Sequence, residues 1–84
     1  MEIEVSRIFK FDGDGPVKAM CDLIVGGKLV VKGFRIVNGK NGMFVSPPRE
    51  QGKDGKWYER VSFLSDDDKH SMSETVLKVY EDEK

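Results

Sequence analysis

The sequence is short of the residues from which most catalytic and covalently linked sites are built. Its 84 residues include one cysteine and one histidine. A single cysteine excludes an internal disulfide framework. Neither a GxGxxG nor a GxxxxGK[ST] motif occurs, so no phosphate-binding loop of a nucleotide enzyme is indicated. We therefore expect no enzyme, no cofactor and no small-molecule substrate.

Long apolar runs are also missing. No stretch approaches the roughly 20 apolar residues needed to span a bilayer. The N-terminal segment "MEIEVSRIFKF" alternates charged and apolar residues, whereas a signal peptide has a continuous apolar core. These features predict a cytoplasmic protein without membrane insertion.

The few reactive side chains have plain structural interpretations. Cys21 alternates in phase with Ala19 and Leu23, which predicts a small buried residue, with a nucleophile as the alternative. His70 stands at a predicted helix start, where we expect it to be exposed; a general base would need a positioned partner and a pocket. The three aspartates at 66–68 are consecutive and cannot converge on one ion from a helix. We expect neither catalytic nor metal-binding residues.

What the sequence does contain is segments in which apolar and polar residues alternate, separated by turns. Apolar and polar residues alternate in a way that predicts strands at about 2–11, 17–25 and 28–37. The short connections "DGDGP" and "GG" favour an antiparallel meander. Ile8 interrupts the first alternation, which indicates a bulge or burial on both faces. Gly33 interrupts the third and indicates a bulge or a close backbone approach.

The second half of the chain contains more residues that form turns or end strands. "NGKNG" predicts a turn into a short strand at 43–46, which Pro47 ends because proline has no N–H to donate. "PPREQGKDGK" then predicts a projecting loop, and "WYERVSFL" a last extended stretch at about 57–63. Ser65 is the predicted N-cap of a helix at about 66–81, and Ser71 with Glu74 forms a second possible start.

Together these elements predict a single domain over residues 1–84 of the α+β class. Its antiparallel β-sheet would have four to five strands joined as a meander of hairpins, followed by a C-terminal α-helix. Apolar residues occur on both faces of the third strand, and one helix can cover one face. A core this small also gains stability from a second chain, so we expect a homodimer.

Charge is distributed unevenly along the chain. Residues 26–60 contain eight basic residues against three acidic ones, whereas the segment from residue 61 onward contains three basic and seven acidic residues. A positive surface in the middle of the chain is one interpretation, and an ordinary mixed-charge surface is the other. The eight basic residues are Lys28, Lys32, Arg35, Lys40, Arg49, Lys53, Lys56 and Arg60.

Several segments can be compared with a known family. "AMCDLIVGGKLVVKGFRIVNGKNGMFVSPPRE", followed by "DGKWYERVSF" and "ETVLKVY", resembles the stage V sporulation protein G (SpoVG) or septation protein family over nearly the whole chain. The stretch "NGMFVSPPR" is the most specific part. Two segments depart from the family pattern: "RVSFL" stands where the family tends to have an aspartate and then "HP-I", and "SDDDK" where it is usually Ser/Thr-rich and basic.

The resemblance implies a bacterial cytoplasmic homodimer that binds DNA or RNA and regulates septation and sporulation. For such a function the basic residues would supply phosphate contacts, and an arginine a base contact, while the aspartates of "SDDDK" would repel phosphates. An alternative is a protein-interaction module that acts on the division machinery without touching nucleic acid. The candidate nucleic-acid-binding residues are Arg35, Lys40, Arg49, Lys53, Lys56 and Arg60.

Overall fold

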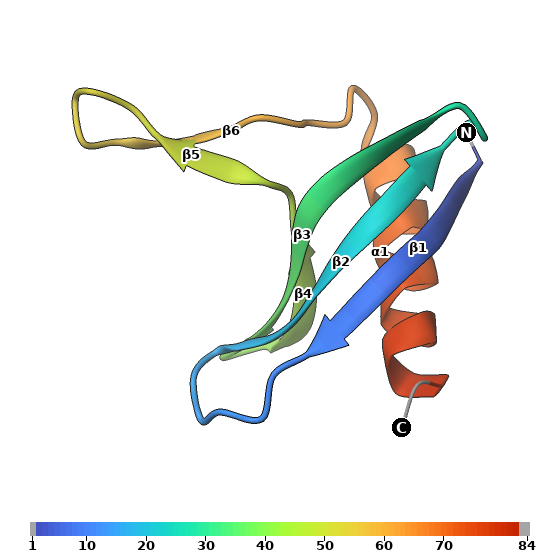
Figure 1. Ribbon diagram of the computed structural model, residues 1–84, viewed down its shortest axis with the longest axis horizontal. Coiled ribbons are helices and arrows are strands. Elements are labelled where there is room, and N and C mark those ends of the chain that lie inside the picture. The colour runs from blue at the N-terminus through green and yellow to red at the C-terminus, as the bar shows by residue number, and fades with distance from the viewer. Residues whose placement is uncertain (1, 83–84) are drawn as a thin grey trace.

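The structure is a computed structural model, and residues 2–82 are described. Four antiparallel strands form one sheet in the order β1-β2-β3-β4, and a two-stranded ribbon, β5-β6, projects from it. The helix α1 lies against one face of the sheet (Figure 1). The elements are β1 (Ile3–Lys10), β2 (Val17–Val25), β3 (Leu29–Gly39), β4 (Gly42–Ser46), β5 (Arg49–Gln51), β6 (Trp57–Glu59) and α1 (Asp66–Asp82). The predicted α+β class, with an antiparallel sheet and a C-terminal helix, is confirmed.

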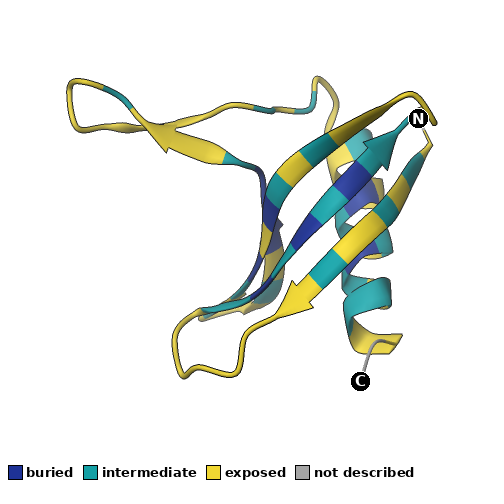
Figure 2. Cartoon of the chain, viewed as in Figure 1, coloured by how far each residue is buried: buried dark blue, intermediate teal, exposed yellow. Residues whose placement is uncertain are grey.

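The core lies between the sheet and the helix (Figure 2). Successive side chains of a strand point to opposite faces, so the alternation in β2 places Ala19, Cys21 and Leu23 on the helix side, where each is fully buried. The helix contributes Met72 and Val76, which are also fully buried. Within the part of the chain that the structure describes, no helix covers the opposite face of the sheet.

The helix begins where the sequence predicts. The backbone N–H of Asp68 donates to Ser65 Oγ at 3.1 Å, so Ser65 is the N-cap. The first turn contains the three aspartates, which suit the positive end of the helix dipole. Ser71 lies inside the helix, so the second possible start is not used.

Glycines shape the sheet at the β2–β3 turn and at the β2–β3 bulge, as expected. Gly26 and Gly27 both adopt positive φ, and the N–H of Lys28 donates to the carbonyl of Val25 at 3.2 Å, which closes the β2–β3 turn. Gly33 has φ 95° at the point where the β2–β3 register shifts, so the predicted bulge is present. The register of β1 shifts between Val5 and Arg7, just before the point at which the sequence pattern breaks.

The segment after β4 differs from the prediction. The expected loop contains the strand β5, and the last extended stretch stops at Glu59 instead of continuing to residue 63. These two strands pair with each other and do not join the main sheet. At the base of the ribbon the N–H of Arg60 still donates to the carbonyl of Pro48 at 2.8 Å, but Pro47 and Pro48 have no N–H to donate, so the strand pairing does not continue through them into the main sheet. Val61 and Phe63 then turn toward the core and are partly buried.

Candidate nucleic-acid interface

The β5–β6 ribbon is held together by its own short-range bonds. At its tip, the N–H of Gly52 donates to the carbonyl of Lys56 at 2.8 Å. The Asp54 carboxylate accepts hydrogen bonds from the Tyr58 hydroxyl and from the N–H of Lys56. The Tyr58 bond first, and the Lys56 bond second, lower the pKa of Asp54, and the same Tyr58 bond raises the pKa of the phenol. The ribbon tip is therefore a defined turn.

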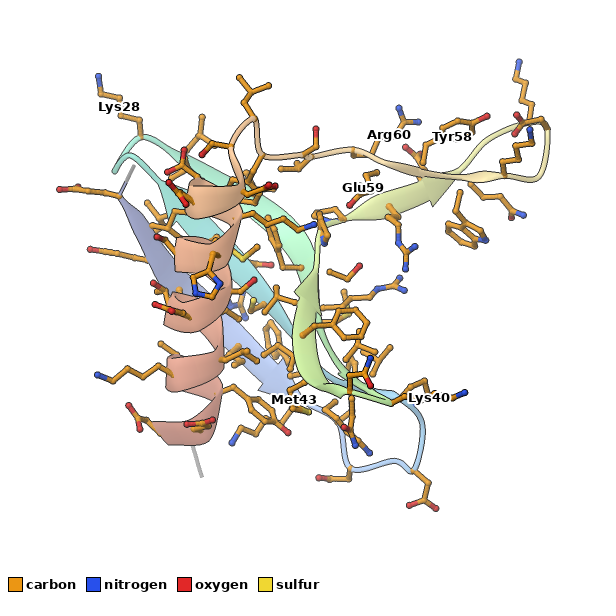
Figure 3. The ribbon with its side chains drawn as sticks, turned by 180° about the vertical axis from the view of Figure 1, so that it is seen from behind. Lys28, Lys40, Met43, Tyr58, Glu59 and Arg60 are labelled. Atoms are coloured by element: carbon orange, nitrogen blue, oxygen red, sulfur yellow. The ribbon has the colours of Figure 1, made fainter. Side chains whose placement is uncertain are left out.

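The two faces of the ribbon present different side chains. The register pairs Arg49 with Glu59 and Gln51 with Trp57, so these four side chains share one face. Glu50 pairs with Tyr58 on the other face, where the guanidinium of Arg60 forms an ion pair with Glu50. Figure 3 shows Tyr58 and Arg60 pointing to the same side of the ribbon.

A small hollow lies where the first of these faces meets the sheet. It has a volume of about 110 Å³ and is lined by Arg35, Arg49 and Trp57. Trp57 is 60% exposed, which is unusual for a residue with so large an apolar ring. Within residues 2–82, no ion pair involves either arginine. We refer to these three residues as the arginine–tryptophan hollow.

The sheet positions Arg35 in this hollow and away from the acidic start of the helix. Arg35 lies between Phe34 and Ile36 in β3, and both neighbours are buried on the helix side. Its own side chain is therefore on the uncovered face. Pro48 packs beside Gly33, two residues earlier: a Cβ placed on the glycine would lie at an ordinary contact distance of 3.8 Å from the Pro48 Cβ. This contact brings the first residue of the ribbon next to β3.

The structure brings some of the six predicted residues together and separates others. Arg35 and Arg49 meet in the hollow, and Lys53 and Lys56 lie in the turn at the ribbon tip. Lys40 lies in the β3–β4 turn. Arg60 is on the opposite face of the ribbon, where Glu50 offsets its charge. Figure 3 shows Lys28 and Lys40 at opposite ends of the sheet, so the basic segment does not form one continuous patch.

Sequence reasoning missed Trp57 as a member of this site. The available signal was that the one tryptophan of the chain stands at the end of a polar, glycine-containing segment. An aromatic ring in that position can be a core residue or a surface contact. The register that puts Trp57 beside two arginines follows from the ribbon pairing.

The other candidate residues take structural positions. Cys21 is fully buried, and burial first, with the nearby charge of Asp22 second, raises the pKa of its thiol to about 11. His70 is exposed on the helix with its Nε2 2.7 Å from the Glu74 carboxylate. Within the described residues no group of three metal-ligating side chains occurs. No helix between residues 2 and 82 has the length and apolar character required to cross a membrane.

Comparison with known proteins identifies the relatives of the chain. The sequence profile of the SpoVG family matches residues 1–82. "Putative septation protein SpoVG" of Archaeoglobus fulgidus is 34% identical over 82 residues, which cover 98% of this chain and 96% of the relative. "Putative septation protein SpoVG 2" of Listeria monocytogenes is 28% identical over 81 residues, which cover 96% of this chain and 79% of the relative. These names refer to septation and specify no enzymatic activity.

Proposed function

Because this chain belongs to the SpoVG family, we propose that it is a regulatory protein that binds DNA or RNA and takes part in the control of cell-division septation and sporulation. We further propose that it acts as a cytoplasmic homodimer. One observation carries the nucleic-acid proposal: Arg35 and Arg49 lie beside the exposed Trp57. Neither arginine forms an ion pair within residues 2–82.

The charge arrangement supports contact with a phosphate backbone. Arg35 and Arg49 present guanidinium groups, which bind phosphate oxygens in bidentate geometry. Lys53 and Lys56 continue the positive charge along the exposed ribbon to its tip. A projecting segment on a rigid sheet is a common place for binding residues. The acidic turn at 66–68 belongs to the helix, on the other face of the sheet from Arg35.

The test replaces the three cations of the ribbon together. Arg49→Ala/Lys53→Ala/Lys56→Ala should weaken binding to a short duplex DNA and to a single-stranded RNA at low salt. The slope of log K against log salt should flatten by up to three contacts' worth, at about 0.9 log unit for each contact with duplex DNA. The measurement is an electrophoretic mobility or anisotropy titration at several salt concentrations, with circular dichroism to check the fold. A triple variant with the affinity and salt slope of the parent would contradict the proposal.

A matched variant changes the acidic side of the molecule. Replacing Asp66, Asp67 and Asp68 together by serine removes three negative charges, so binding to the same nucleic acids should strengthen. The two triple variants change net charge by the same amount in opposite directions. Equal effects of opposite sign would indicate a response to net charge alone, whereas a larger effect of the ribbon variant supports contact through the ribbon.

A second candidate function is a protein-interaction module that acts on the division machinery. An apolar groove of about 280 Å³ favours it; the groove lies between the segment 61–64 and the sheet, and Leu29 and Leu64 are among its lining residues. Leu64 is fully exposed and Leu29 is 54% exposed. Binding of a protein through such a groove would depend little on salt, which distinguishes it from binding to phosphates.

A further inference from the structure

We infer that the arginine–tryptophan hollow binds an unpaired base of a single-stranded nucleic acid, with the base stacked on Trp57 and the adjoining phosphates held by Arg35 and Arg49. The inference rests on the proposed function and narrows it to a substrate class. It starts from three side chains that the ribbon and the sheet bring to one point.

The first step concerns the indole ring. Trp57 is held in β6 opposite Gln51, so its backbone position is fixed by strand pairing while the residue remains 60% exposed. A large apolar ring exposed in this way offers a flat π-surface that binding can cover. Every nucleobase has a matching flat face, and stacking of bases on aromatic side chains is the common device of single-strand binding.

The second step concerns the charges around the ring. Arg35 comes from the sheet and Arg49 from the ribbon, so two cations flank the hollow from different elements. Neither is engaged by a carboxylate within residues 2–82. Glu59 is paired with Arg49 on the same ribbon face but does not line the hollow. The two arginines favour an anionic ligand, and Trp57 favours a flat one. A nucleotide has both features, because its base is flat and its phosphates are anionic.

The third step distinguishes single strands from duplexes. In a duplex the faces of each base are covered by its neighbours, so a base must leave the stack before it can lie on an indole ring. Duplex DNA can therefore reach the arginines through its phosphates, whereas an unpaired strand can use the arginines and Trp57 together.

The experiment uses Trp57 as its own probe, because it is the one tryptophan of the chain. Tryptophan emission is recorded while the protein is titrated with 12-nucleotide oligouridine, 12-nucleotide oligothymidine and a 12-base-pair DNA duplex. Both single strands should quench the emission at saturation, and the duplex should quench it less. The uridine and thymidine arms show whether the strand is preferred as RNA or as DNA.

Variants test the stacking separately from charge. Anisotropy with labelled oligonucleotides should show Trp57→Ala binding single strands about tenfold more weakly, the fold-change expected for one lost stacked base. Trp57→Phe keeps an aromatic ring and should retain most of the affinity. Phe11→Ala, which removes a ring that is 44% exposed elsewhere, is the matched control and should bind as the parent does. Trp57 is exposed, so the urea midpoint of Trp57→Ala should stay near that of the parent.

Several results would overturn the inference. Unchanged Trp57 emission at saturating single strand would do so, as would a Trp57→Ala variant that keeps parental single-strand affinity. Binding of the duplex without binding of single strands would reject the inference and leave the proposed function in place. Absence of binding to all three nucleic acids would reject both.

Discussion

Gly33 shows how one residue controls the geometry of the candidate site. It occupies the β2–β3 bulge with φ 95°, a backbone conformation that residues with a side chain rarely adopt. The space above it is not the limiting factor, because an added Cβ would lie at an ordinary contact distance of 3.8 Å from Pro48. The requirement for glycine is therefore conformational.

We predict that Gly33→Ala lowers the free energy of unfolding by about 1–2 kcal/mol, the cost of placing a Cβ in a positive-φ conformation. Urea unfolding followed by circular dichroism measures this change. Gly15→Ala is the control, because Gly15 has no close neighbours and no positive φ. Equal stability of Gly33→Ala and the parent would show that the bulge relaxes without cost.

Cys21 provides a second residue-scale prediction, because burial raises the pKa of its thiol to about 11, above the ordinary value of 9.0. The folded state therefore holds the thiol proton more tightly than the unfolded state does. Its contribution to stability is complete below pH 9 and is lost as the pH rises from about 9 toward 11. The thiol should also react slowly with a disulfide reagent at about pH 8 until the protein is unfolded in urea.

The control for this pH dependence is Cys21→Ala. That variant should be less stable by about 1 kcal/mol at neutral pH because it leaves a small cavity. Its stability should fall less steeply than that of the parent between pH 9 and about 11, because it lacks the buried thiol. Parallel pH profiles would contradict the assigned pKa shift.

At the scale of elements, α1 depends on a start signal that is entirely local. The Ser65 side chain accepts a hydrogen bond from the third residue after it, and the following aspartates suit the helix dipole. The helix then places Met72 and Val76 in the core. These two residues are four apart, so they share the helical face that meets the sheet.

We predict that Ser65→Ala destabilises the protein by about 1 kcal/mol, because the N–H of Asp68 loses its side-chain partner. Urea unfolding provides the measurement. Ser71→Ala is the matched control: Ser71 is exposed within the helix, where alanine is the better helix former, so this variant should be neutral or slightly stabilising. A Ser65→Ala variant as stable as Ser71→Ala would mean that the cap contributes nothing.

The nucleic-acid proposal and the base-stacking inference both depend on the ribbon. Each of its strands has three residues, all exposed, and it packs apart from the main sheet. Its order comes from the Asp54 turn, the Glu50–Arg60 pair and the bond between Arg60 and Pro48. Binding segments are commonly drawn from elements with so few buried contacts.

At the scale of the whole molecule, the uncovered face of the sheet is the surface on which we expect a second chain to pack. Phe9, Val30 and Phe44 are each about half exposed on this face, at 47%, 48% and 50% respectively. Val30 pairs with Ile24 near the β2–β3 turn, on the side of the molecule away from the ribbon tip (Figure 1). A second chain over this end of the sheet would cover Val30 and leave the ribbon accessible, whereas Phe9 and Phe44 lie toward the other end of the sheet.

We predict that the protein is a homodimer at a protein concentration of about tens of micromolar, at which a moderately tight dimer is populated. Val30→Glu should shift the protein toward monomer in sedimentation equilibrium, because it places a charge in the covered surface. Ser71→Glu, on an exposed position of the helix, adds the same charge and should leave the dimer intact. A parent protein that sediments as a monomer at this concentration would contradict the assembly.

Much of the fold could be predicted because its determinants are local. The alternation of Ala19, Cys21 and Leu23 predicts a buried strand face from spacing alone, and the glycine pair predicts a turn because two successive positive φ values favour glycine. Ser65 marks the helix start for the same kind of reason. The ribbon was harder to predict from the sequence. Its strands have three residues each, which is too short for an alternating pattern that would distinguish a strand from a loop.

The sequence by itself determined the class of fold, the composition of the core and the set of available cations, since these follow from residue type and spacing along the chain. Only the tertiary structure decided which of those cations act together. Strand register and the contact at Gly33 bring Arg35, Arg49 and Trp57 to one hollow, while Arg60 is directed to the other face and paired with Glu50. The physical reason is that these relations join residues far apart in the chain through backbone pairing, which no local pattern encodes.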